Sequence, residues 1–229
     1  IPVTDPYTDS DGTDRYAIWE KVAEGIGNLQ ALRKISITDI CFADDEEGPL
    51  APDWEILACI LRRLRRGIQL CMQDETINIW DTEALPAFDR AIHGQAMITR
   101  FSTGAGFPFH CLDILCSALL TLPALENVSF EHIAEQGPEE GQSLESMIKL
   151  LKSPSLREVT FVSVDFTNNL FQAVAAKVLK ERSQITDLSF SGCSFPEGGS
   201  AVIARALKTN TTLKGLVFDD GADDGFYEG

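Results

Sequence analysis

The chain has 229 residues, of which 44% are hydrophobic, and it carries a formal net charge of −16. This length and hydrophobic content are sufficient to bury a core, so we expect one large folded domain or two small ones. A chain with this negative charge repels the phosphate groups of a nucleic acid. We therefore expect no nucleic-acid partner, and the charge favours a protein partner that is basic or of mixed charge.

Residues 1–14 form an acidic, polar start that we predict to be a flexible segment. It lacks the basic and apolar regions of a secretory signal, and no window of the chain approaches eighteen consecutive apolar residues. We therefore expect no transmembrane segment and an intracellular, cytoplasmic protein. Because the chain begins at Ile1 rather than Met, location in an organelle after removal of a targeting segment stays open.

Residues 32–42 carry apolar residues at the first, fourth, sixth, ninth and eleventh positions, which predicts a half-buried strand. The following segment, 56–64, has its apolar residues on one face of a helix and runs into the sequence LRRLRR. The arginines fall mainly on the opposite, solvent side of this helix. They are Arg62, Arg63, Arg65 and Arg66. They form either a solvated face paired with acidic neighbours or a docking patch for an acidic partner.

The middle of the chain, residues 67–110, shows only a weak pattern. The 93 residues from Leu32 to Leu125 would hold three units of 31, so we predict two degenerate strands, near 67–72 and 97–103. The alternative is an insertion that interrupts the repeats.

The strand pattern returns clearly in the second half of the chain, beginning at Leu125, Leu156, Ile185 and Leu213. The spacing is 31 residues from 125 to 156, 29 from 156 to 185 and 28 from 185 to 213. Segments with one apolar helical face, such as 170–179 and 202–207, separate the strands. A single strand–helix unit cannot cover its own apolar face. We therefore predict an α/β solenoid with parallel strands on one side and helices on the other.

Three features resemble leucine-rich repeats of the ribonuclease-inhibitor type. They are the pattern L-x-x-L-x-F-x-x-C-x-F, matched best at 185–195, the period of 28 to 29 residues, and the turn NTTL at 210–213. The resemblance implies a curved solenoid of about seven repeats over residues 15–218, regular from 122 and degenerate over 43–121. The chain departs from the family at position 9 of the pattern, where only Cys193 supplies the expected Asn or Cys. Residues 219–229 are predicted to be an acidic tail or the start of a further repeat.

Positions 3, 5 and 7 of each strand should point out of the concave side of the sheet, because side chains alternate along a strand. Position 5 is a hydroxyl residue in four of the five clear strands, which predicts a column of small polar groups flanked by acids. Such a column suits a crowded, exposed sheet even without a ligand, and it also suits a hydrogen-bonding surface for a basic protein. The candidate partner-binding residues are Ser36, Asn127, Ser129, Glu131, Glu158, Thr160, Asp187, Ser189, Ser191 and Asp219.

Six cysteines occur without a CxxC pair, and there are only three histidines, so we expect no metal site and no cofactor. Several cysteines stand where the pattern requires a small buried residue, which favours reduced structural thiols over disulfides. The chain lacks the common nucleophile, phosphate-loop and metalloprotease motifs, and His132 stands alone at a predicted strand end. We therefore expect no catalytic residues and no enzyme activity.

Three functions fit these features. The first is a non-catalytic interaction scaffold that binds a protein on its concave sheet. The second is a regulator of an enzyme, either an inhibitor of a basic enzyme or a GTPase activator. The Ran GTPase activators have similar repeats and acidic tails, but no arginine of this chain matches their motif. The third is an architectural subunit of a larger complex.

Overall fold

The computed structural model describes residues 15–29, 31–37, 52–72, 84–104, 109–133, 144–166, 168–180 and 183–219. The predicted flexible start, the acidic tail from 220 and the second half of the first predicted strand lie outside these residues. Within them, strands and helices alternate along the chain. None of the described helices is long and apolar enough to cross a membrane.

Seven parallel strands form one sheet in which each strand pairs with the next one in chain order. They are β1 Lys34–Ile37, β2 Ile68–Met72, β3 Ile98–Ser102, β4 Asn127–Glu131, β5 Glu158–Val162, β6 Asp187–Ser191 and β7 Gly215–Asp219. The two degenerate strands predicted near 67–72 and 97–103 are confirmed as β2 and β3. The sheet therefore continues through the weakly patterned middle of the chain.

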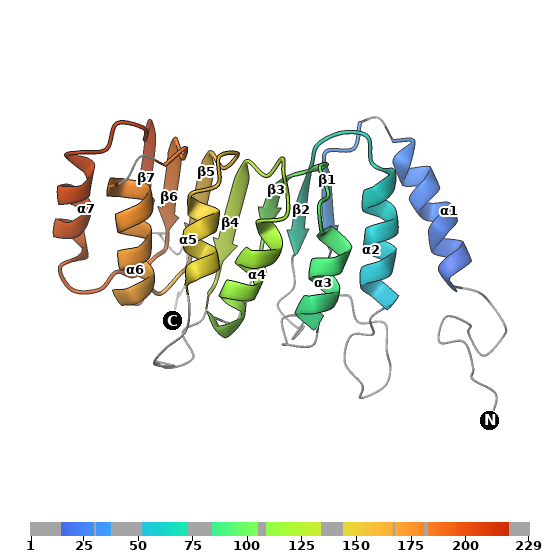
Figure 1. Cartoon of the computed structure of the whole chain (residues 1–229), viewed down its shortest axis with the longest axis horizontal. Helices are drawn as coiled ribbons and strands as arrows, with labels where there is room; N and C mark the ends of the chain where they lie inside the picture. The colour runs from blue at the N-terminus through green and yellow to red at the C-terminus, as the bar shows by residue number, and fades with distance from the viewer. Residues whose placement is uncertain are drawn as a thin grey trace, which may run out of the picture.

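The helices stand side by side in a single layer on one face of the sheet (Figure 1). They are α1 Arg15–Gly27, α2 Pro52–Arg63, α3 Ala84–Ile92, the 3-10 turn η1 Phe109–Cys111, α4 Leu112–Leu119, α5 Glu145–Leu151, α6 Asn168–Val174, its π-helical continuation η2 Ala175–Lys180, and α7 Gly199–Leu207. This two-layer α/β arrangement, with one strand and one helix per unit, is the repeating architecture that the sequence predicts.

The core lies between the two layers. In β4, β5 and β6 the fourth and sixth positions of the repeat are buried and the flanking positions are not, as predicted. The helices contribute fully buried residues such as Leu115 in α4 and Leu170 in α6. Both Cys111 and Cys116 are buried in this layer, which confirms that they are core residues.

A ladder of stacked phenylalanine rings runs through the core across the last four strands, and we call it the phenylalanine ladder. It consists of Phe130, Phe161, Phe190 and Phe218, with ring centroids 5.5, 5.6 and 5.2 Å apart and interplanar angles of 19°, 10° and 12°. Phe166 and Phe195 make a second, parallel stack at 5.5 Å. Contacts of this kind add to the hydrophobic gain from burying large rings, so the ladder ties each repeat to its neighbour.

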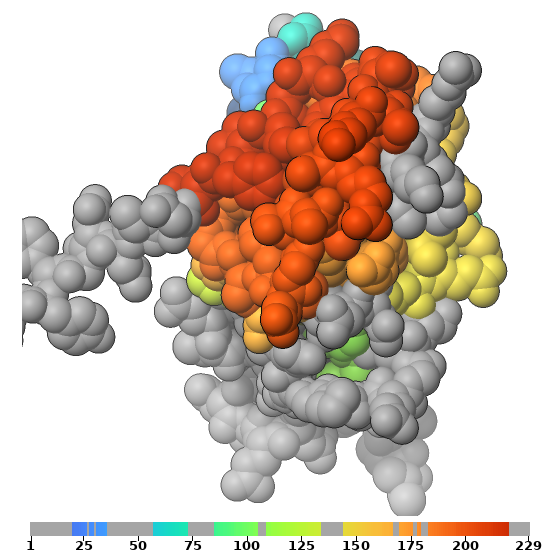
Figure 2. All heavy atoms as spheres, turned by 90° about the vertical axis from the view of Figure 1, so that its left-hand side faces the viewer, coloured from blue at the N-terminus to red at the C-terminus, as the bar shows by residue number. Residues whose placement is uncertain are grey.

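The last rung of the ladder corrects one expectation. The pattern assigns Leu216 and Phe218 to the core, yet Leu216 is half-buried, and Phe218 and its neighbour Val217 are 51% and 52% exposed. The reason is that no described repeat packs beyond β7, so one side of each of these residues has no neighbour. Figure 2 looks onto this end of the molecule, where α7 and β7 face the viewer.

Two polar side chains join successive repeats. The Cys193 thiol lies 3.4 Å from the carbonyl oxygens of both Phe161 in β5 and Ser191 at the end of β6, so the one residue that matches the family pattern at position 9 links the bend after β6 to the preceding repeat. Asn210 donates to the carbonyls of Val178 and Leu179, and its Oδ1 accepts from the backbone of the turn before β7. Each side chain therefore adds a hydrogen-bond link between the backbones of neighbouring repeats.

The strands β4, β5 and β6 are each followed by a residue with positive φ: His132 at 48°, Ser163 at 50° and Gly192 at 59°. The backbone N–H of each donates to the next strand, at 2.8, 2.7 and 2.8 Å respectively. The positive φ is thus a recurring feature of the exit from the strand. Only glycine adopts it without steric cost.

We expect Phe161→Ala to lower the free energy of unfolding by about 3–5 kcal/mol, because the ring is fully buried in the ladder. Phe218→Ala, which removes the same ring at the half-exposed end, should cost about 1 kcal/mol. Urea unfolding followed by circular dichroism measures both values. Equal losses for the two variants would contradict the role of the ladder.

We expect Ser163→Gly to raise the free energy of unfolding by about 0.5–1 kcal/mol, because relief of the positive φ outweighs the greater chain entropy of glycine. Gly192→Ala is the reciprocal control and should destabilise by about 1 kcal/mol. Its added Cβ would also lie only 3.3 Å from the Ser163 hydroxyl oxygen. Thermal unfolding of the two variants and the wild type measures both changes in stability. The prediction requires that Ser163→Gly stabilise and Gly192→Ala destabilise the protein.

Candidate protein-binding surface

The face of the sheet opposite the helices, which we call the open face, carries the side chains at positions 3, 5 and 7 of each repeat. The strand register arranges them in rows that cross the sheet. The middle row consists of Ser36, Cys71, Ser102, Ser129, Thr160, Ser189 and Val217. The first row consists of Lys34, Gln69, Arg100, Asn127, Glu158, Asp187 and Gly215.

The middle row contains the predicted hydroxyl column. Ser129, Thr160 and Ser189 are direct neighbours in register and are all half-buried. The register also places Cys71 and Ser102 in this row, between Ser36 and Ser129. The sequence pattern did not identify these two residues, because the degenerate strands match the repeat too weakly to assign a position. Small polar residues therefore share this register position on six successive strands, and Cys71 and Ser102 are buried there, at 2% and 6% exposed.

The first row has a charge gradient that the sequence pattern did not reveal. The exposed side chains of Lys34 and Arg100 stand toward the β1 end, and the half-buried Glu158 and the exposed Asp187 stand toward the β7 end. Asn127 separates the two charge types and donates from its amide to Glu158. In the first row the predicted acids therefore stand on β5 and β6, and the other two, Glu131 and Asp219, stand on the other side of the middle row, on β4 and β7.

Glu131, at the end of β4, is the centre of a hydrogen-bond network on the open face. One of its carboxylate oxygens accepts from the Ser102 hydroxyl at 2.5 Å and from the Ser129 hydroxyl at 3.0 Å. Its backbone N–H donates to the Thr103 hydroxyl at 2.8 Å. Ser102 and Thr103 are 6% and 1% exposed, so these bonds satisfy groups that water barely reaches. The network fixes the hydroxyl row where β3 meets β4.

The β7 end of the open face is more open and more acidic. The Asp187 carboxylate accepts from the Thr186 hydroxyl at 2.7 Å and lies over Gly215, where a Cβ would be 2.3 Å from its oxygen. Ser191 is half-buried and Asp219 is exposed in the third row. A side chain at 215 would therefore require the Asp187 carboxylate to move.

The open face offers no activated nucleophile among its described residues. Burial raises the pKa of the Cys71 thiol, and the charge and hydrogen bond of Lys34 offset this only in part. Cys71 is therefore a neutral thiol near pH 7. His132 is exposed, and its positive φ is the backbone conformation that recurs where these strands end. Within the described ranges, no three His, Cys, Asp or Glu side chains gather as a metal site would require.

The arginine cluster at the end of α2 divides into two pairs. Arg62 donates to the carbonyl of Ala58 at 3.2 Å, and Arg63 pairs with Glu20 of α1 at 3.1 Å. Arg63 thus follows the expectation of a solvated face paired with acidic neighbours, whereas Arg62 bonds a backbone carbonyl of its own helix. Arg65 and Arg66 lie beyond the helix and border a pocket instead.

Comparison with known proteins finds no family model that matches the chain and no significantly similar curated protein. The functional argument therefore depends on the geometry of the surface itself.

We expect Glu131→Ala to lower the free energy of unfolding by about 1–2 kcal/mol, because the buried Ser102 hydroxyl loses its charged acceptor. Glu126→Ala removes the same charge from the exposed residue just before β4 and should change stability by less than about 0.5 kcal/mol. Chemical denaturation of both variants measures the difference. Equal effects would mean that the network contributes nothing specific.

Proposed function

We propose that the chain is a non-catalytic scaffold that binds a protein segment on the open face of its sheet. The observation that carries this proposal is the row of half-buried hydroxyl side chains Ser129, Thr160 and Ser189 on three neighbouring strands, beside a first row that carries charges of opposite sign. Short hydroxyl groups leave a flat surface on which the partner's backbone and side chains can hydrogen-bond. No bulky side chain of the middle row blocks access along β4, β5 and β6.

The charge gradient defines the chemistry of the partner. Arg100 and Asp187 stand three strand spacings apart, which is about 14 Å at the usual separation of neighbouring strands. An extended peptide covers about 3.3 Å per residue, so about four or five residues bridge the two charges. We infer that the partner segment crosses the strands with an acidic side chain near Arg100 and a basic one near Asp187. This assigns the mixed-charge option rather than a purely basic partner.

We further propose that the chain is a leucine-rich-repeat protein of the ribonuclease-inhibitor type and that it acts inside the cell. The first part is supported by the strand–helix unit of 28 to 31 residues and by the roles of Asn210 and Cys193 in the turns. The second is supported by Cys59, Cys71, Cys116 and Cys193, which are free thiols. Free thiols are typical of reducing compartments.

The test uses the triple variant Ser129→Arg, Thr160→Arg and Ser189→Arg as bait in an extract of the source cells. Three long side chains would cover the middle row, so we expect recovery of a stoichiometric partner to fall at least ten-fold. The matched control carries Ser117→Arg, Gln172→Arg and Ser200→Arg, which place the same three side chains at exposed positions of the helix layer.

Both baits must unfold at a temperature close to that of the wild type for the comparison to count. Loss of the partner with the open-face variant alone supports the proposal. Equal recovery with the two variants would move the binding site away from the open face.

A further inference from the structure

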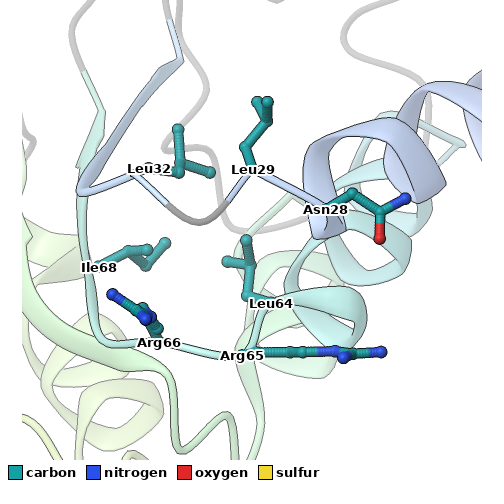
Figure 3. Close-up of a pocket in the computed structure, with 7 residues that line it drawn as sticks. All are labelled: Asn28, Leu29, Leu32, Leu64, Arg65, Arg66 and Ile68. Carbon is teal, nitrogen blue, oxygen red and sulfur yellow. The ribbon is translucent and has the colours of Figure 1, made fainter.

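A pocket of about 210 Å³ lies where the first two repeats turn from helix to strand, away from the open face. It is bordered by Asn28, Leu29, Leu32, Leu64, Arg65, Arg66 and Ile68. Figure 3 shows the four aliphatic side chains around the opening, with Arg66 beside Ile68. We call it the arginine pocket.

The pocket has an apolar floor and a more exposed rim. Ile68 and Leu64 are 1% and 9% exposed, and Leu32 is half-buried. Leu29 is 57% exposed, the largest fraction of any large apolar side chain in the described part of the chain. An exposed leucine beside a pocket that aliphatic and polar side chains line together is available to cover an apolar group that enters it.

Backbone hydrogen bonds hold the walls of the pocket. The N–H of Leu29 donates to Ile26 at 2.9 Å, and that of Leu32 donates to Leu29 at 3.2 Å. On the other wall Leu64 donates to Leu61 at 3.2 Å, and Ile68 donates to Met97 at 2.7 Å. Tight turns of this kind form the hollow before any ligand arrives, which lowers the entropy cost of binding.

The rim of the pocket is positively charged. Arg65 and Arg66 are both exposed, and neither forms an ion pair or hydrogen bond with another described residue. Arg62 and Arg63 contrast with them, because both have partners nearby. In a chain of net charge −16, two such guanidinium groups beside an apolar hollow form a local site for negative charge.

The size of the pocket separates two kinds of ligand. Sites for small organic molecules usually enclose about 300–1,000 Å³, which is more than this pocket holds. A hollow of this volume is suited to one large side chain of a protein partner, such as the buried anchors that dominate many protein interfaces. The charged rim would then contact residues next to that anchor.

We propose that the arginine pocket binds a short acidic peptide segment of a protein partner through one bulky apolar side chain. The apolar side chain enters between Leu29, Leu32, Leu64 and Ile68. Carboxylates beside it in the peptide pair with Arg65 and Arg66. This site is separate from the open face and does not depend on the function proposed for that face.

The test measures fluorescence anisotropy of a labelled peptide with the sequence DDFDD on the full chain. We expect saturable binding that weakens as salt rises, because exposed charge pairs are screened. The double variant Arg65→Glu and Arg66→Glu should weaken binding at least ten-fold, and Leu29→Asp should also weaken it at this exposed position. The peptides DDADD and KKFKK, which lack the anchor or the negative charge, should bind at least ten-fold more weakly than DDFDD.

The matched control is the double variant Arg205→Glu and Lys208→Glu, which makes the same charge change at two exposed residues at the other end of the molecule. It should bind DDFDD within two-fold of the wild type. Thermal unfolding checks that each variant is folded. Lack of saturable DDFDD binding to the wild type, equal binding of DDADD or KKFKK, or equal losses in the two double variants would overturn the proposal.

Discussion

Stacking of phenylalanine rings from one repeat onto the next is the interaction on which the rest of the structure depends. The ring centroids of the phenylalanine ladder are 5.2 to 5.6 Å apart, slightly more than the spacing of neighbouring strands. A one-residue slip between two strands would move a ring out of the core and onto the open face. The ladder therefore fixes the register, and the register places Ser129, Thr160 and Ser189 in one row.

The ladder ends at β4, and different contacts continue the core toward β1. The equivalent position after β3 is Thr103, whose hydroxyl accepts from the backbone of Glu131 instead of stacking. Phe88 of α3 packs against Phe101 at 5.9 Å and fills part of the same layer. Thr103, which stands where the ladder would have a phenylalanine, thus belongs to the Glu131 hydrogen-bond network. The same residue therefore ends the ring stacking and fixes hydrogen bonds on the open face.

The two proposed binding surfaces use charge in different ways. On the open face, opposite charges are separated along one row, which favours a partner of mixed charge and a single direction of binding. In the arginine pocket, like charges border an apolar hollow, which favours an acidic partner. Both surfaces are positive near β1 and β2, although the chain as a whole is strongly negative. Net charge alone therefore predicts neither partner.

The sequence by itself determined the repeating strand–helix unit, the regular strands from β4 onward and the buried positions within them, because each of these follows from apolar spacing inside one repeat. Only the tertiary structure decided where Arg100, Cys71 and Ser102 lie. The register shifts between β2 and β3. A shift of one residue moves each side chain of a strand to the opposite face of the sheet, so residue spacing alone cannot assign the face. The sequence likewise did not show that Arg62 and Arg63 have hydrogen-bond partners whereas Arg65 and Arg66 have none among the described residues. Nor did it show that Phe218 is exposed. Both depend on which neighbours the fold brings into contact.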